Sequence, residues 1–358
     1  MKNITHTYTA LGIMSGTSLD GVDLALCTFE EHSTGWAFNI LKAKTIAYSD
    51  AWKQRLIDLP LANSESYVRA DYEYGDYLGG LATKFLESES IKPQLIASHG
   101  HTIFHNPTEG YTAQLGFGGA IAAKTKITTV SDFRSIDIML GGQGAPLVPI
   151  GDELLFSEYN QCLNLGGFAN ISYCNGGNRL AGDISVCNFI LNRLAASNGL
   201  LYDAGGALAK RGVQIPELLK KLNALPFYSS PFPRSLGREW VEKNILPLIE
   251  FDNYCVENLL ATFTEHIAIK IAEVINQAPG KKILATGGGV YNNYLVERIR
   301  YFLSDNKKLE TGSPQIAEYK EALIFAFLGV LRHINRTNVL CSVTGAQRNH
   351  IAGAIFHS

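Results

Sequence analysis

The spacing of apolar and polar residues predicts a chain that begins with β-strands and continues with helices. Apolar runs over Gly12–Gly16 and Val22–Phe29 flank a turn, and Phe38–Tyr48 continues the sheet as a third strand. Helical spacing follows from Ala51 to Leu59 and from Ser64 to Leu86. The pattern therefore predicts an α/β fold that opens with a three-stranded sheet.

A buried strand and a glycine-rich segment organise the middle of the chain. The apolar run Leu95–Ser98 predicts a buried strand that ends abruptly at His99. Three glycines and a proline within Gly141–Pro146 are poor in either helix or strand, and they predict a domain boundary. We therefore expect an N-terminal domain over residues 1–140 and a C-terminal domain over residues 141–358.

The pattern of the opening hairpin recurs beyond this boundary. Cys162–Ser172 is a second strand, glycine turn and strand, and Val256–Val274 carries the apolar stripe of a long helix. Lys282–Ala285 predicts another strand, followed by a glycine turn and a helix. This echo indicates a duplicated architecture with a cleft between the two halves.

Composition narrows the class of protein. A chain of 358 residues is too long for one simple core, and its net charge of -2 excludes non-specific nucleic-acid binding. No apolar run is long enough to cross a bilayer, and the first residues lack the apolar run of a signal peptide. The six cysteines are scattered without a C-x-x-C pair. These features predict a cytoplasmic globular protein without disulfides.

Three glycine-rich turns are candidates for nucleotide binding. The first offers backbone N–H groups and hydroxyls suited to a phosphate, and it consists of Gly16, Thr17, Ser18, Leu19, Asp20, Gly21, Val22 and Asp23. The others are Gly166 and Gly167, between two predicted strands, and Gly287, Gly288 and Gly289, before a predicted helix. Each alone is also typical of an ordinary exposed turn. Together they would converge on a nucleotide if the two halves face each other.

Asp183 lies between a predicted strand and the helical run Phe189–Ala196. An aspartate beside a helix start is commonly an N-terminal cap, because it accepts hydrogen bonds from free N–H groups. Alternatively, a rigid strand end holds this carboxylate as a general base. The residues by themselves leave both interpretations open.

Histidines and a charged group lie close to the predicted boundary. His99, His101 and His105 suit either metal ligation or hydrogen bonding in a cleft, although no carboxylate or cysteine completes a metal set. Arg134 and Asp137 could form a salt bridge between the domains. Alternatively, the planar guanidinium of Arg134 could bind an anionic group of a substrate.

Taken together, these segments resemble the anhydro-N-acetylmuramic acid kinases over nearly the whole chain. The matching segments, in chain order, are Met14–Asp23, His99–His105, Asp132–Arg134 with Gly141–Pro149, Asn164–Ile171, the proline loop Ser230–Leu236 with Gly237–Glu239, Gly287–Gly289 and Ser342–Ala346. By its residues alone, the proline loop is a rigid loop that enters a helix, and its expected role is structural. The resemblance implies an actin-like, duplicated RNase H-like fold with two domains around a central cleft. It also implies ATP with Mg²⁺ as cofactors and a recycled cell-wall amino sugar as the substrate.

The resemblance further implies roles for individual residues. Gly16–Asp23 would line the ATP phosphates, and Asp183 would be the catalytic base. Glu321 matches the family's Glu-Ala-x-x-Phe-Ala, so we expect it at the start of a helix facing the cleft, where the helix dipole would also favour a glutamate. Substrate contacts would come from His101, Arg134 and Asp137.

The chain departs from the family pattern around the expected sugar and γ-phosphate. Asp183–Asn188 is Asp-Ile-Ser-Val-Cys-Asn in place of Asp-Thr-Gly-Pro-Gly-Asn, and Asn192 stands where the family usually has another aspartate. Phe117 replaces the aspartate of Gly-Asp-Gly, and His101 replaces the glutamine of His-Gly-Gln. These changes bear on substrate identity and rate more than on the fold.

Three functions follow as hypotheses. The first is hydrolysis of the 1,6-anhydro bridge of anhydro-N-acetylmuramic acid coupled to phosphorylation of O6. The second is an actin-like kinase acting on a plain hydroxyl of another amino sugar. The third is a catalytically weak ATP-binding clamp with a regulatory role. A homodimer is kept as one option for the assembly.

Overall fold

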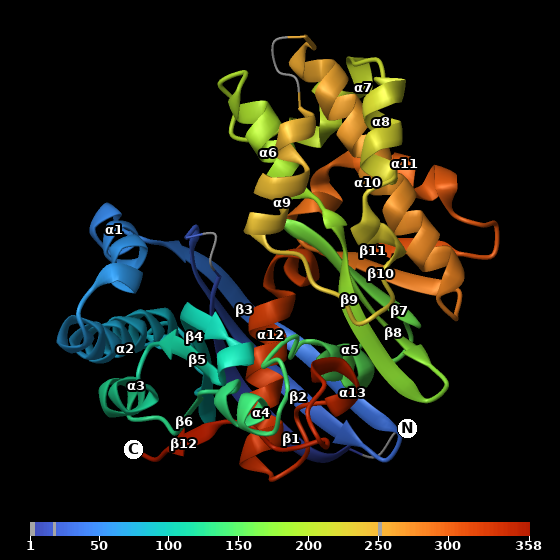
Figure 1. Cartoon of the computed structure of the whole chain (residues 1–358). Coiled ribbons are helices and arrows are strands. Elements are labelled where there is room, and N and C mark those ends of the chain that lie inside the picture. The colour runs from blue at the N-terminus through green and yellow to red at the C-terminus, as the bar shows by residue number, and fades with distance from the viewer. Residues whose placement is uncertain (1–3, 17–18, 250–252) are drawn as a thin grey trace. The chain divides into compact units, whose positions relative to one another are not determined.

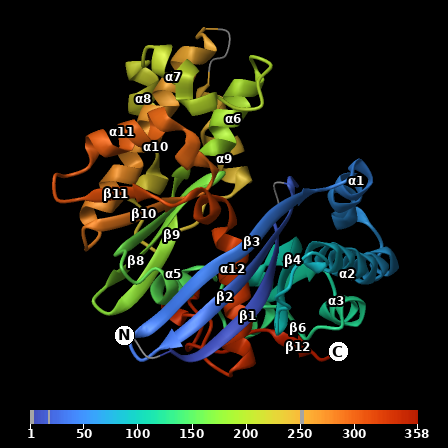
Figure 2. The same ribbon diagram turned by 180° about the vertical axis from the view of Figure 1, so that it is seen from behind.

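A computed structural model describes residues 4–16, 19–249 and 253–358 of the chain (Figures 1 and 2). The chain divides into two compact units. Unit 1 comprises Met1–Phe156 and Tyr319–Ser358, and unit 2 comprises Ser157–Glu318. In the described part of the chain, no helix has the length and apolar character needed to cross a membrane.

The described part of unit 1 is built on one seven-stranded sheet with the order β12-β6-β4-β1-β2-β3, and β5 pairs with β4 beside this path. Its strands are β1 (Ile4–Ser15), β2 (Gly21–His32), β3 (Gly35–Ala47), β4 (Leu95–Asn106), β5 (Tyr111–Leu115), β6 (Thr129–Ser131) and β12 (Ala354–Phe356). β1, β2 and β3 pair antiparallel, whereas β4 runs parallel to β1 and β6 runs parallel to β4. The predicted three-stranded opening sheet is confirmed.

Helices cover both faces of this sheet. They are α1 (Asp50–Asp58), α2 (Ser64–Leu86), α3 (Gly118–Thr125), α4 (Ser135–Met139), α5 (Pro149–Leu155), α13 (Cys341–Thr344) and α12 (Pro314–His333), whose part from Tyr319 onward belongs to unit 1. The side chains of Ser49 and Asn63 cap α1 and α2 by accepting backbone N–H groups of the first turn. Tyr74 and Leu78 of α2 are fully buried in the core on one face. On the other face, Phe327 of α12 packs against Phe29 of β2.

Unit 2 contains a five-stranded sheet among its described residues, with the order β11-β10-β7-β8-β9. Its strands are β7 (Gln161–Leu165), β8 (Phe168–Asn175), β9 (Asn178–Val186), β10 (Lys282–Thr286) and β11 (Lys308–Thr311). β7, β8 and β9 pair antiparallel, and β10 and β11 continue the sheet as parallel strands. This order and these directions repeat those of β6-β4-β1-β2-β3, which confirms the predicted duplication of a mixed α/β unit.

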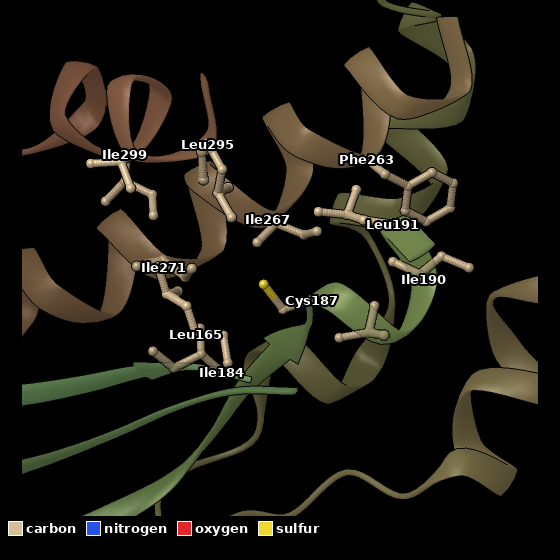
Figure 3. Close-up of a cluster of buried hydrophobic side chains, with 14 of the residues drawn as sticks. Leu165, Ile184, Cys187, Ile190, Leu191, Phe263, Ile267, Ile271, Leu295 and Ile299 are labelled. Carbon is tan, nitrogen blue, oxygen red and sulfur yellow. The ribbon is translucent and has the colours of Figure 1, made fainter. Parts of the chain in front are cut away.

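The helices of unit 2 pack around the long helix α10. They are α6 (Asn188–Ala196), α7 (Ala207–Arg211), α8 (Pro216–Asn223), α9 (Arg238–Asn244), α10 (Val256–Gln277) and α11 (Asn293–Phe302). Phe263, Ile267 and Ile271 of α10 are fully buried and meet Leu165 of β7 and Ile184 of β9 in one core (Figure 3). The predicted apolar stripe therefore docks α10 onto the sheet.

The division into units differs from the predicted boundary between residues 140 and 141. The chain leaves unit 1 at Phe156 and returns to it at Tyr319. The glycine-rich segment stays in unit 1 because its backbone is tied there. The N–H of Gly142 donates to the Asp137 carbonyl at 2.8 Å, and the N–H of Gln143 donates to the Thr344 carbonyl at 2.8 Å. The glycines of this segment therefore belong to a tight loop that is hydrogen-bonded to unit 1, and they do not form a linker between domains.

The predicted end of the fourth strand at His99 is also wrong. β4 continues to Asn106 because β5 folds back on it, with His101 opposite Leu115. Gly100 has φ +73°, and this bend marks the point at which β4 changes neighbours. The sequence pattern missed the extension because it lacks an apolar run: its buried residues are His99, Gly100 and His101, and the rest are half-buried or exposed.

Candidate functional site

The candidate phosphate turn joins β1 to β2 in unit 1. Ser15 pairs with Val22 and Met14 pairs with Asp23, so the ladder closes directly below the turn. Leu19 has φ +60°, and its N–H approaches the Gly16 carbonyl at 3.4 Å. Thr17 and Ser18 lie outside the described residues. The turn therefore is a true hairpin end, with Asp20 exposed and Asp23 half-buried.

Glycine is required at Gly21 for a packing reason. A Cβ there would lie 2.5 Å from the carbonyl oxygen of Ile46 in β3. At Gly12, a Cβ would overlap the Ala322 carbonyl oxygen, so the missing side chain lets α12 pack directly on β1. This contact places the segment around Glu321 beside the strand that leads into the turn.

Glu321 does not lie at the start of its helix, as the sequence had suggested. α12 begins at Pro314, seven residues earlier, so the helix dipole at the first turn does not explain the glutamate. Its side chain is accessible to solvent, but the surrounding protein raises the pKa of its carboxyl by desolvation. Arg134 opposes this rise, and Asp23 adds to it. Glu321, Arg134 and Asp23 thus interact electrostatically within unit 1.

Arg134 is held by a histidine and a backbone carbonyl. The Nδ1 atom of His99 lies 2.9 Å from the Gly100 carbonyl oxygen, which can only accept, so Nδ1 carries the proton. Its Nε2 atom then accepts from Nε and Nη2 of Arg134 at 3.0 and 2.8 Å. Burial lowers the pKa of His99 well below its ordinary value, which keeps the ring neutral. Arg134 also donates to the Gly144 carbonyl, which leaves part of its five-donor fork available.

His101 belongs to a buried chain of hydroxyl groups below the phosphate turn. Its Nδ1 atom lies 2.8 Å from Oγ of Ser15, and that oxygen lies 2.6 Å from the hydroxyl of Tyr48. The Tyr48 hydroxyl in turn contacts the hydroxyl of Tyr74. Burial lowers the pKa of His101 to about 4. A neutral His101 therefore ties the last residue of β1 to β4 and α2.

Asp137 is fully buried, and its carboxylate is engaged by the protein. The N–H of Gly144 donates to Oδ2 at 2.6 Å, and the hydroxyl of Thr344 donates to Oδ1 at 2.7 Å. The carboxylate thus joins the glycine-rich segment to α13. This position fits an anchor of the loop better than a contact with a ligand.

The histidines do not come together as a metal centre. In the described ranges, no group of three or more His, Cys, Asp or Glu side chains is arranged to hold a metal ion. His99 faces Arg134, His101 faces Ser15, and His105 contacts Thr112. All six cysteines are free thiols.

In unit 2, Asp183 lies within β9 and does not cap a helix. α6 begins five residues later at Asn188, with Cys187 at the N-cap position. Asp183 pairs with Asn170 across the ladder and is half-buried. Burial raises the pKa of its carboxyl, although hydrogen bonds from Leu236 and Ser235 oppose the rise. A rigid strand therefore holds a carboxyl of increased basicity.

The proline loop donates hydrogen bonds to the Asp183 carboxylate. The N–H of Leu236 donates to Oδ2 of Asp183 at 2.7 Å, and the Ser235 hydroxyl lies 3.3 Å from the same oxygen. Oδ1 of Asp183 accepts no hydrogen bond from the described residues, so this oxygen is free to accept a proton.

Arg234 fastens the loop to the strand. Its Nε donates to the Asp183 carbonyl at 3.0 Å, and its Nη1 donates to the carbonyls of Tyr228 and Ser230 at 3.1 and 2.8 Å. The Asp183 N–H donates in return to the Arg234 carbonyl at 2.9 Å. Sequence reasoning had given this loop only a structural role, because nothing in its spacing connects it to Asp183.

The second glycine turn docks the start of α6. The Gly167 carbonyl accepts the N–H groups of Cys187 and Phe189 at 2.8 and 3.1 Å, and the Gly166 carbonyl accepts that of Asn188 at 3.1 Å. Gly167 is exposed and Gly166 is half-buried. The turn between β7 and β8 thus lies beside the segment that follows Asp183.

The third glycine turn borders a pocket of about 480 Å³ in unit 2. Gly287 has φ +84°, and a Cβ on Gly289 would lie 2.6 Å from Cβ of Leu165, so both positions require glycine. Gly288 faces open space and lines the pocket. Exposed Tyr202 and Tyr291 form part of its wall, together with asparagine side chains. Sequence reasoning missed these tyrosines, because an isolated exposed tyrosine carries no spacing signal.

Comparison with known proteins agrees with this arrangement. The family model described as anhydro-N-acetylmuramic acid kinase matches residues 8–358. Curated proteins of that name are 33% identical in Sulfurimonas denitrificans and 34% identical in Pseudomonas fluorescens, each over 97% of this chain and 98% of the relative. The protein of that name from Pasteurella multocida is 34% identical over 99% of this chain and 98% of its own length. The chain therefore belongs to the anhydro-N-acetylmuramic acid kinase family.

Proposed function

We propose that this kinase opens the 1,6-anhydro bridge of anhydro-N-acetylmuramic acid with water and phosphorylates the released O6, with Asp183 as the general base. The observation that carries the proposal is the Asp183 carboxylate, which is fixed through Oδ2 and free at Oδ1. A base works best when its pKa lies nearer to the working pH, and burial moves Asp183 in that direction.

The proposed reaction has two parts, hydrolysis of the bond between C1 and O6 and transfer of the γ-phosphoryl group to O6. Asp183 takes a proton from water while the water oxygen bonds to C1 and the bond from C1 to O6 breaks. The released O6 then attacks the γ-phosphorus of ATP, and ADP leaves. The products are N-acetylmuramic acid 6-phosphate and ADP, and Asp183 returns its proton to solvent.

Each unit by itself offers groups that suit a part of the nucleotide. The pocket beside Gly288 has exposed aromatic and amide side chains suited to an adenine ring. The turn from Gly16 to Asp23, which closes the hairpin of β1 and β2, would offer backbone N–H donors to the phosphates. Mg²⁺ would neutralise phosphate charge, and the exposed Asp20 is a hard oxygen ligand of the type this ion prefers. Gly166, Gly167, Gly287 and Gly289 would support this site by holding its turns in shape.

Substrate binding would fall to unit 1. The guanidinium of Arg134 keeps donors free beyond those given to His99 and Gly144, so it suits the carboxylate of a muramic acid. His101 would hold Ser15 and hence the phosphate turn in place. Glu321 would stabilise positive charge developing at C1, and Glu321→Gln should slow opening of the anhydro sugar without changing ATP affinity. We assign no ligand contact to Asp137.

One incubation distinguishes the candidate functions. The enzyme is mixed with ATP, Mg²⁺ and the anhydro sugar, and the product is weighed by mass spectrometry. Addition of phosphate plus water supports the proposal. Addition of phosphate alone indicates a kinase of a plain hydroxyl, and ATP binding without a product indicates a regulatory clamp. Six free thiols suit action in the reducing cytoplasm, and the homodimer stays a prediction.

Arg234 is expected to act as a positioning residue for Asp183. Arg234→Lys keeps the charge but has a single nitrogen, which cannot occupy the positions of both Nε, the donor to the strand, and Nη1, the donor to the loop. We expect kcat to fall on the order of 10-fold, because small misplacement of a catalytic group is costly. The KM for ATP should stay unchanged in the same steady-state assay.

The matched control is Arg238→Lys. Arg238 is exposed and pairs with Glu242 on its own helix, so its replacement should leave kcat unchanged. Equal kinetics for the two variants, with a lower melting temperature for Arg234→Lys alone, would limit the loop to a structural role.

A further inference from the structure

A pocket of about 310 Å³ lies within unit 1 at the edge of β4. Its walls come from α2, β4, β5, the start of α3, the segment after β6, and β12. All of the residues that line it belong to unit 1. It contains none of the residues to which we assign catalysis or nucleotide binding.

The fold creates this pocket by splitting the sheet. One edge of β4 pairs with β1, and the other edge is shared by two strands. Pairing with β6 ends at Ala97, opposite Val130, and pairing with β5 begins at His101. The residues between these ladders have no strand beside them on that edge. The edge of β4 is thereby left without a neighbouring strand at Ser98–Gly100, which line the pocket as buried residues.

Ser98 provides the main polar feature inside the pocket. The residue is fully buried, and its hydroxyl has no hydrogen-bond partner among the residues that the structure describes. Buried polar groups are nearly always paired, so an unpaired hydroxyl that lines a pocket indicates a missing partner. Asp71 lines the same pocket and accepts the N–H of Gly116 at 2.6 Å. A ligand would meet one unpaired hydroxyl and one anchored carboxylate.

The charges and aromatic rings of the pocket restrict what it can bind. Asp71 and Asp132 contribute carboxylates, and among the described residues no lysine or arginine lines the pocket, so an anion is disfavoured. Tyr67, Phe117 and Phe356 contribute aromatic rings, with Phe117 and Phe356 in edge contact at 5.2 Å. Hydroxyls, carboxylates and aromatic faces together suit a ring that carries hydroxyl groups on its rim and C–H groups on its faces.

We propose that this pocket is a second carbohydrate site, which binds one neutral sugar ring through Ser98, Asp71 and its aromatic wall. The pocket adjoins the proposed substrate contact, because His99 lines the pocket and also accepts hydrogen bonds from Arg134. Its volume lies at the lower end of the range for small-molecule pockets, which fits a single ring.

The test uses three sugars that share a ring and differ in charge. N-acetylglucosamine is neutral, glucosamine is cationic and glucuronate is anionic near neutral pH. Each is titrated into the full chain without nucleotide, and binding is measured by calorimetry. We expect saturable binding of one N-acetylglucosamine per chain and none of glucuronate. Absence of N-acetylglucosamine binding, or tighter binding of glucosamine, would overturn the proposal.

Ser98→Ala localises the site. Loss of one hydrogen bond should weaken N-acetylglucosamine binding by about 2- to 10-fold. Because the hydroxyl is unpaired in the free protein, the variant should melt no lower than the wild type. Ala113→Trp, which places a large ring against the pocket, should abolish binding. Unchanged affinity in both variants would place the sugar elsewhere.

Thr264→Val is the matched control for removal of an unpaired hydroxyl. Thr264 of α10 is fully buried in unit 2, and its hydroxyl also lacks a partner within the described part of the chain. This variant should bind N-acetylglucosamine like the wild type. Asp183→Asn should also keep this binding while it loses turnover, so the pocket and the proposed reaction can fail independently.

Discussion

Replacing Asp183 by asparagine is expected to lower kcat about 10²–10⁴-fold, the usual contribution of a positioned base. The amide oxygen can still accept from Leu236 and Ser235, so the loop should stay docked. The amide cannot take a proton from water, and ATP affinity should stay nearly unchanged. Steady-state kinetics with the anhydro sugar and calorimetry with ATP measure the two quantities.

Stability gives this prediction an independent check. Burial raises the pKa of Asp183 in the folded protein, so the ionised carboxylate is less favourable there than in the unfolded chain. That cost is present above the folded pKa and disappears as the pH falls through it toward the unfolded value. Asparagine avoids the cost, so the variant should be at least as stable as the wild type at neutral pH.

The same shift sets the acid limb of activity. Wild-type turnover should fall as the pH drops through the raised pKa of Asp183, because the protonated carboxyl is no longer a base. A variant with wild-type turnover and reduced stability would make Asp183 a structural residue. The proposed mechanism would then be untenable.

Asp137→Ala is expected to lower the free energy of unfolding by about 2–4 kcal/mol. The substitution leaves the buried N–H of Gly144 and the hydroxyl of Thr344 without their acceptor. It also removes one of the two links between the glycine-rich segment and α13, because the bond from the Gln143 N–H to the Thr344 carbonyl remains. Urea unfolding followed by circular dichroism measures the loss.

Asp58→Ala serves as the control for loss of an aspartate in unit 1. Asp58 is exposed and accepts one hydrogen bond from Gln54, so its removal should change stability by about 0.5 kcal/mol or less. If Asp137→Ala instead kept full stability and lost affinity for the anhydro sugar, Asp137 would be a substrate ligand, as the sequence resemblance implied.

Local features of unit 1 were predictable because each depends on residues close in the chain. The strands before and after Gly16–Asp23 follow from apolar alternation, and the two helices after Tyr48 follow from helical spacing and capping residues. Gly21 must be glycine because the backbone of β3 passes close to it. The sequence shows the glycine but not the strand that requires it.

The candidate site was less predictable, because its contacts join distant residues. Asp183 stood out in the sequence, but its surroundings were uncertain until β9 was seen to extend past it. Leu236, which fixes its carboxylate, lies 53 residues away. Glu321 was placed at a helix start because its motif gave no sign of the preceding turns of α12.

The sequence by itself determined the strands, the helices, the glycine turns and the repetition of one motif, because hydrophobic period and turn chemistry act over a few residues. It also determined the family, through motifs such as Met14–Asp23. Only the tertiary structure decided that Gly141–Pro149 is an anchored loop, that the proline loop clasps Asp183, and that β4 leaves a gap at Ser98. Each of these features depends on a hydrogen bond or a strand pairing between segments far apart in the chain. The local pattern of residues does not indicate which distant segments will pair.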